Sequence, residues 1–88
     1  MTDKRRERLR FRSWHRGTRE MDLLLGSFAD MHIHSFSPEQ LMQYEALLVQ
    51  ADPDLYNWIT GAEALPDALN NNVGQLLLSS LDSRSWVS

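Results

Sequence analysis

The sequence has no cysteine among its 88 residues, and it has only four glycines and three prolines. Without cysteine the chain can form no disulfide, no iron–sulfur cluster and no thiolate zinc site, and it has no thiol nucleophile. Its few glycines form neither a G-x-G-x-x-G pattern nor a Walker A phosphate loop. These absences exclude the redox and metal-binding proteins that depend on cysteine, and the nucleotide-binding proteins that depend on such loops.

The sequence also lacks a long apolar run. Its apolar stretch at residues 21–25 is much shorter than the roughly 20 residues of a membrane span, and too short for the core of a secretory signal. The chain is likewise too short for a TIM barrel, which needs about 200 residues or more. Since 42% of the residues are hydrophobic, we expect one small globular domain that is soluble, not exported and not inserted in a membrane.

Basic side chains are almost absent after residue 19. Residues 1–19 contain eight of them against two acidic ones, a net charge of +6, whereas residues 20–88 contain one arginine against ten carboxylates, a net charge of -9. An arginine-rich beginning is typical of a transit peptide, but such peptides are rich in serine and poor in acids. We therefore expect the basic segment to belong to the folded domain.

An arginine-rich helix with aromatic side chains between its cations is one way to bind nucleic acid. Such a face would be formed by Lys4, Arg5, Arg8 and Arg12, with Phe11 and Trp14 beside them. The acidic remainder of the chain would repel a phosphate backbone. We expect no nucleic-acid partner, and a small nucleic-acid-binding or regulatory protein remains the alternative function.

The spacing of apolar residues predicts an all-α protein, a compact bundle of five short helices without a strand. The first helix covers about residues 3–14, and because it is polar almost all round we expect it to dock late or fray. The second, about 18–33, begins at Thr18 as N-cap and should be the most buried. The third begins with a capping box, in which Ser37 precedes Pro38 and is followed by Gln40.

The last two helices are less regular in sequence. The fourth is predicted to begin with Asp52 as N-cap and Pro53 as its first residue, and to end near Gly61. The fifth begins after Pro66, with an apolar stripe from Leu69 to Leu81 whose first half is weakened by three asparagines. We expect a single domain over residues 1–81 and a disordered tail over 82–88.

No catalytic or metal site is apparent. His32 and His34 are two residues apart, so on a helix they would point in nearly opposite directions and could not share a metal ion. His15 has no visible partner, and a chain this small offers no scaffold for a Ser–His–acid triad. We therefore expect a protein that is not an enzyme, with no catalytic residue and no metal.

The junction of the first two helices carries a more specific pattern, Arg16-Gly17-Thr18-Arg19-Glu20. Glycine at a tight corner permits a positive φ or the close approach of another backbone. An arginine fork and a glutamate beside it could dock reciprocally with another polypeptide. On this pentapeptide alone, a structural turn with a surface pair between Arg16 and Glu20 is the simpler interpretation.

Two motifs together carry a family resemblance. The R-G-x-x-E corner followed by Met21-Asp22-Leu23, with the D-x-D-L-x-x-W segment of residues 52–58 downstream, resembles the FAD assembly factor family of succinate dehydrogenase, known in bacteria as SdhE. The resemblance covers about residues 8–81, and members of that family are five-helix proteins. This chain departs from the family at His15, where some members have a second arginine, and in its asparagine-rich last helix.

The resemblance implies an assembly chaperone of the bacterial cytoplasm. It would bind the flavoprotein subunit of succinate dehydrogenase, and in bacteria also of fumarate reductase, and promote covalent attachment of FAD to a histidine of that subunit. The chemistry would belong to the client. Because the sequence has no phosphate loop, we expect no tightly bound cofactor, and we expect a monomer. The resemblance places the centre of the docking surface at Arg16, Gly17 and Glu20, its rim at Arg19 and His15, and adds Asp54. A generic helical interaction module, such as an antitoxin, also stays open.

Overall fold

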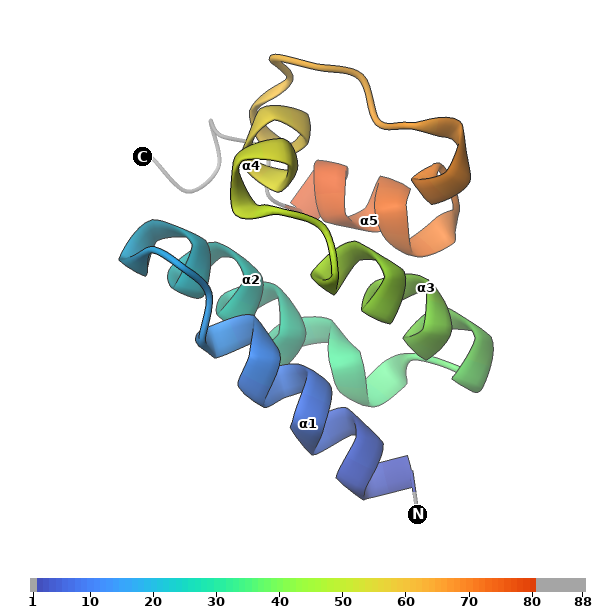
Figure 1. Ribbon diagram of the computed structural model, residues 1–88. Coiled ribbons are helices and arrows are strands. Elements are labelled where there is room, and N and C mark those ends of the chain that lie inside the picture. Colours follow the sequence, from blue (N-terminus) through green and yellow to red (C-terminus); the bar gives the residue numbers. More distant parts are fainter. Residues whose placement is uncertain (1, 81–88) are drawn as a thin grey trace.

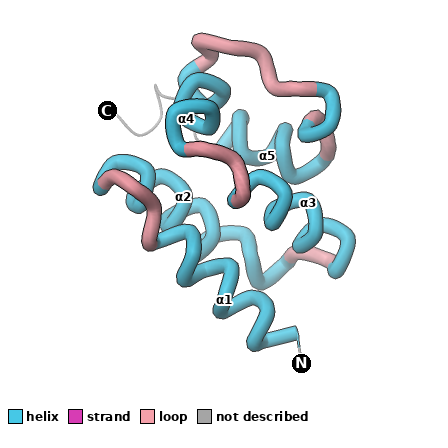
Figure 2. The backbone as a smooth tube through the Cα atoms, viewed as in Figure 1, coloured by secondary structure: helices cyan, strands magenta, loops and turns pink. Residues whose placement is uncertain are grey.

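The computed structural model describes residues 2–80, and its side chains from residue 4 onward. It contains five α-helices: α1 (Thr2–Trp14), α2 (Arg19–His32), α3 (Pro38–Leu48), α4 (Asp52–Thr60) and α5 (Asn72–Ser80). Two short 3-10 segments, η1 (Ile33–Ser35) and η2 (Asp67–Leu69), extend α2 and precede α5. Figure 2 shows helices joined by short loops and no strand in this range, so the all-α prediction is confirmed. The predicted disordered tail lies outside the described residues.

The helices form two groups that share α3. α1 and α2 lie side by side as an antiparallel pair, and α3 packs against both α1 and α5 (Figure 1). α4 contacts α5 and lies near the beginning of α2 in the view of Figure 1. This arrangement places two corners of the chain, the one between α1 and α2 and the one between α3 and α4, on the same side of the molecule.

The core is centred on α2, as predicted from its apolar spacing. Leu25 and Ala29 are fully buried, and Phe28 packs its ring against that of Tyr44 with centroids 5.5 Å apart. Phe36 completes an aromatic cluster with these two rings. The remaining core includes Trp58 of α4 and is otherwise largely aliphatic, with Leu9, Leu41, Leu47, Leu55, Val73 and Leu77 at most 2% exposed.

α1 differs from the expectation that it would fray, because it is packed against α2 along its length. Leu9 is 2% exposed and Ser13 is fully buried. Near the end of the helix, the indole of Trp14 lies directly over Gly26, where a Cβ would come within 2.1 Å of the ring. The polar composition of α1 concealed this contact, because the missing side chain of a glycine on α2 leaves the space that the indole fills.

Local signals at the helix ends are mostly confirmed. Ser37 and Gln40 form the predicted capping box with bonds of 3.2 and 2.9 Å. Thr18 caps α2 by accepting a bond from the amide of Met21, and Gly61 ends α4 with a left-handed φ of 84°. Two predictions are wrong. Asp52 is not the N-cap of α4, because that position is occupied by Ala51.

The second correction concerns α5, which begins only at Asn72. Leu69, predicted on its stripe, lies in η2 instead. The side chain of Asn71 accepts a bond of 2.9 Å from the amide of Gly74. This bond at the beginning of α5 stops the helix from extending back to Leu69, since the asparagine oxygen takes the place of a backbone acceptor.

The buried hydroxyl of Tyr44 makes the fold lose stability at alkaline pH. Tyr44 is fully buried, its hydroxyl lies 2.6 Å from that of Ser13, and burial raises the pKa of Tyr44 to about 12. The folded pKa therefore exceeds the unfolded value of about 10, so this stabilisation is complete below pH 10 and is lost as the pH rises toward 12.

For Tyr44→Phe we expect about 1 kcal/mol less stability at pH 8, with a smaller deficit at pH 11. Urea unfolding at both pH values measures it, and a deficit that is constant or grows with pH would contradict the assignment.

Candidate functional site

The side chain of Arg16 points into the molecule. It is 11% exposed, and its Nε and Nη2 lie 2.9 and 2.8 Å from one carboxylate oxygen of Asp52, at the beginning of α4. Its remaining donors bind two carbonyls of the α3–α4 connection, Nη1 to Leu48 at 2.8 Å and Nη2 to Gln50 at 3.0 Å. A single guanidinium thus ties the α1–α2 corner to the α3–α4 corner.

The second oxygen of Asp52 accepts a bond of 2.7 Å from the backbone amide of Gly17. A Cβ at residue 17 would lie 2.9 Å from this oxygen, closer than ordinary packing permits. The backbone of Gly17 has no positive φ, so the glycine serves here to leave room for the carboxylate. The close approach predicted at this corner exists, but the approaching group is a side chain of the same protein.

Two carboxylates therefore hold the corner, and sequence reasoning assigned neither of them this role. Asp22 accepts a short hydrogen bond from the amide of Arg16, while Asp52 binds both Arg16 and Gly17. Asp52 lies too far along the chain for a local rule to reveal its partner, and its chemistry at a helix beginning equally fits a cap. The presence of both motifs in one sequence is the signal that could have predicted this contact, since the first motif contains Arg16 and Gly17 and the second contains Asp52.

The other predicted site residues are exposed. Arg19 and Glu20 begin α2, and Asp54 lies in the first turn of α4. Among the described side chains Glu20 makes no ion pair with Arg16, so the surface pair considered for this corner is not formed. His15 stacks on Phe11 with ring centroids 3.8 Å apart, and its Nδ1 lies 2.7 Å from the carbonyl of Phe11.

A groove of about 230 Å³ lies between the beginnings of α2 and α4. It is lined by Thr18, Glu20, Met21, Asp52, Pro53 and Tyr56. Tyr56 is 38% exposed and was not predicted as a site residue. An exposed tyrosine beside a shallow groove is common where one protein binds another, because its ring supplies apolar area and its hydroxyl a hydrogen bond. The structure thus brings the two sequence motifs together around one concave surface.

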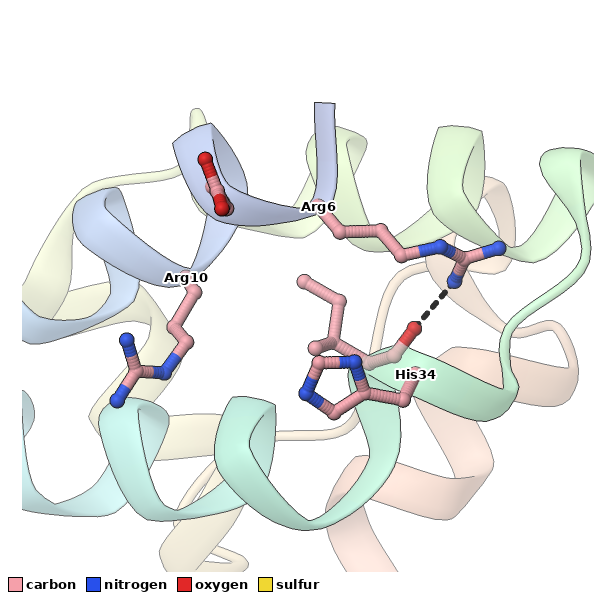
Figure 3. Close-up of a pocket in the computed structure, with 5 residues that line it drawn as sticks. Arg6, Arg10 and His34 are labelled. Carbon is pink, nitrogen blue, oxygen red and sulfur yellow. Dashed lines mark hydrogen bonds between the residues drawn. The ribbon is translucent and has the colours of Figure 1, made fainter. Parts of the chain in front are cut away.

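A second hollow, of about 290 Å³, lies between α1 and η1 and is shown in Figure 3. Arg6 donates to the carbonyl of Ile33, and Arg10 donates to the carboxylate of Asp30. The two guanidinium groups point apart, with His34 between them (Figure 3). Both arginines are already bound within the chain, and Glu7 also lines the hollow, so these cations do not converge on an anion.

The arginines of α1 mostly bind other parts of the same chain. Arg5 and Arg12 both pair with Glu45 on α3, at 3.4 and 3.7 Å. With the contacts of Arg6, Arg10 and Arg16, five of the eight cations in residues 1–19 are engaged internally. This use of the basic segment gives no support to a nucleic-acid interface, because few cations remain for phosphate contacts.

Residues 2–80 contain no cluster of three histidine or acidic side chains that could hold a metal ion. Over the same range, none of the helices has both the length and the apolar character that crossing a membrane would require.

Comparison with known proteins identifies the family. The family described as flavinator of succinate dehydrogenase matches residues 7–80. Succinate dehydrogenase assembly factor 2, mitochondrial, of Dictyostelium discoideum is 43% identical over 75 residues, which cover 85% of this chain and 53% of that protein. FAD assembly factor SdhE of Acetobacter pasteurianus is 41% identical over 63 residues, which cover 72% and 58%. The chain thus spans little more than half the length of these relatives. Since the family match includes both motifs, the second half of α1 and the four other helices, this chain belongs to the family of succinate dehydrogenase flavinators.

Proposed function

We propose that this protein is an assembly factor that binds the flavoprotein subunit of succinate dehydrogenase and promotes covalent attachment of FAD to a histidine of that subunit. The observation that carries the proposal is the bond between the amide of Gly17 and the carboxylate of Asp52. It joins the two motifs that carry the family resemblance. Both Glu20, which lines the groove, and Asp54 stay exposed.

The residues around the groove have two different tasks in this proposal. Glu20, Arg19, His15 and Asp54 are exposed and contact the client. Arg16 is largely buried and held by four hydrogen-bonding contacts, so it positions the corner. Gly17 is exposed at the centre of the docking surface, and its amide binds the carboxylate of Asp52.

The protein would contribute geometry, with no reacting group of its own. The flavin and the histidine that it joins belong to the client. Holding the two in a reactive arrangement can lower a barrier by several kcal/mol through orientation alone. An assembly factor of this kind has no need of a catalytic residue, and we propose that this chain is not an enzyme.

The exposed carboxylate of Glu20 offers the most direct test. Glu20→Lys should weaken binding of the purified flavoprotein subunit at least about tenfold, since charged contacts at an interface often contribute 1.4 kcal/mol or more. Covalent flavin, measured by fluorescence of the denatured subunit, should fall in parallel. The matched control is Glu39→Lys, an exposed carboxylate in the first turn of α3. Equal behaviour of the two variants would remove Glu20 from the docking surface.

We further propose that the chain binds no cofactor tightly. FAD is the cargo of the client, and the described surface has no glycine-rich phosphate loop. Titration calorimetry of the protein with FAD should therefore show no binding at micromolar concentrations. A dissociation constant of a few micromolar would contradict this and would move part of the FAD-binding task to the assembly factor.

Three finer points complete the proposal. The flavoprotein of fumarate reductase is a second client, the protein is a monomer, and it acts in the cytoplasm of a bacterium. The Acetobacter relative supports a bacterial setting, whereas the Dictyostelium relative is named as mitochondrial. Flavin fluorescence of both flavoproteins after gene deletion, sedimentation of the pure protein and cell fractionation test these points.

A further inference from the structure

The outer face of α1 carries a row of exposed side chains that the folding of the chain does not use. Lys4, Arg8 and Phe11 follow one another at intervals of four and three residues, which places them within an arc of about 60° on the helix. His15, the residue directly after the end of α1, continues the row by stacking on Phe11. All four are exposed. Leu9 and Ser13, on the opposite side of the helix, are buried. We call this row the α1 outer stripe.

Phe11 is the apolar centre of the α1 outer stripe. Its side chain is 61% exposed. A single exposed apolar residue is ordinary on a protein surface, but this ring is stacked on His15, whose Nδ1 is held at 2.7 Å from the Phe11 carbonyl. The two rings therefore form a preorganised platform, which reduces the entropy lost when a partner covers it.

The cations of the stripe differ from the other cations of α1. Lys4 and Arg8 make no ion pair with any side chain that the structure describes, and the same is true of Arg19 at the beginning of α2. The neighbouring arginines Arg5 and Arg12, on the inner flank of the helix, both pair with Glu45. Ion pairs within the fold thus occupy the inner cations Arg5 and Arg12, whereas the outer cations Lys4 and Arg8 remain available to a partner.

We propose that the α1 outer stripe is a second contact surface for the client flavoprotein, and that it docks on an acidic patch with an apolar hollow for Phe11. This inference rests on the proposed function. Two observations favour this occupant. The cations require a surface of opposite charge, and the stripe ends at His15, the residue before the Arg16–Glu20 corner, so that one client surface can cover both.

A nucleic acid and a second copy of the chain are weaker candidates. Three unpaired cations are few for a phosphate backbone, and residues 20–88 carry a net charge of -9, which would repel it. A second copy could offer its groove to the stripe, but of the two carboxylates that line this groove Asp52 is already bound to Arg16 and Gly17, so Glu20 alone would face the two cations of the stripe.

The test compares Phe11→Ser and Arg8→Glu with the wild type in binding to the purified flavoprotein subunit at 50 and 300 mM salt. Met42→Ser, a similarly exposed apolar residue on α3, is the control. We expect Phe11→Ser to raise the dissociation constant at least about tenfold at both salt concentrations, as is usual for an anchor residue. Arg8→Glu should raise it about as much at 50 mM and less at 300 mM, because salt screens the charge. Circular dichroism should show unchanged helix content in all three.

The outcomes separate the two proposals. If both stripe variants bind like the wild type while Glu20→Lys does not, the stripe is not a contact surface and the proposed function stands. If the wild type does not bind the flavoprotein, both proposals fail. Association with a second copy or with nucleic acid that is lost in Phe11→Ser or Arg8→Glu, without any effect on flavoprotein binding, would overturn the assignment of the occupant.

Discussion

Arg16→Ala is expected to destabilise the protein by about 3 kcal/mol, because it removes the side chain that joins the α1–α2 corner to the α3–α4 corner. The substitution leaves the carboxylate of Asp52, which is 18% exposed, without its guanidinium, and leaves the carbonyls of Leu48 and Gln50 without donors. Losing one member of a largely buried ion pair typically costs 3–5 kcal/mol. Because the free energy of unfolding of small domains is only about 5–15 kcal/mol, the substitution would remove a large part of it.

Urea unfolding of three variants measures this effect. Arg8→Ala is the control, an exposed arginine of α1 whose loss should change the free energy of unfolding by less than about 0.5 kcal/mol. Arg16→Lys should fall between the two, because an ammonium group cannot reach a carboxylate and two carbonyls with the same fork. In a double-mutant cycle with Asp52→Ala, the coupling energy should exceed about 1 kcal/mol. Equal stability of Arg16→Ala and Arg8→Ala would show that the observed network does not hold the corner.

This result would also change how variants of the corner are interpreted. A loss of flavin attachment in Arg16→Ala would follow from a displaced Gly17–Glu20 segment, without direct contact between Arg16 and the client. Hydrogen exchange distinguishes a positioning role of Arg16 from direct contact between Arg16 and the client. If Arg16 only positions the corner, its variants should lose client binding in proportion to the loss of structure around α4, which hydrogen exchange of the α4 amides reports.

Gly17→Arg is expected to abolish client binding. A long charged side chain would project into the proposed docking surface, where Gly17 is exposed, and its Cβ would already press on the carboxylate of Asp52 at 2.9 Å. We expect the dissociation constant for the flavoprotein to rise more than about a hundredfold, equivalent to about 2.8 kcal/mol. Covalent flavin on the client should fall to the level seen without the assembly factor.

Gly17→Ala separates the two effects of this substitution. Alanine introduces the contact with Asp52 and adds nothing beyond it, so its cost should be about 1 kcal/mol of stability, with most of the client affinity retained. Ser27→Arg, at an exposed position of α2, controls for the added charge. Binding is measured well below the melting temperature of every variant. A folded Gly17→Arg protein that still supports flavin attachment at the normal rate would show that the interface is wrongly placed.

Local signals in the sequence predicted the helices because their causes are local. The capping box at Ser37 and Gln40 and the left-handed Gly61 depend on atoms within a few residues. The apolar spacing of α2 identified the central helix for the same reason, since one helix face repeats every three to four residues. The two motifs indicated the family, which the match over residues 7–80 confirms.

The role of the site residues depended on contacts that sequence spacing does not contain. Asp52 and Arg16 are 36 residues apart, and either could have faced solvent as a cap or a surface charge. The basic beginning of the chain was visible as +6 in 19 residues, yet only packing shows that Arg5 and Arg12 neutralise Glu45 while Lys4 and Arg8 remain outside. Helix formation is governed by neighbours in sequence, whereas the partner of a charge is chosen by which helices the core brings together. The residues of this chain therefore specify its helices and its family directly, and the tertiary structure decides which charges hold the fold and which are left for a partner.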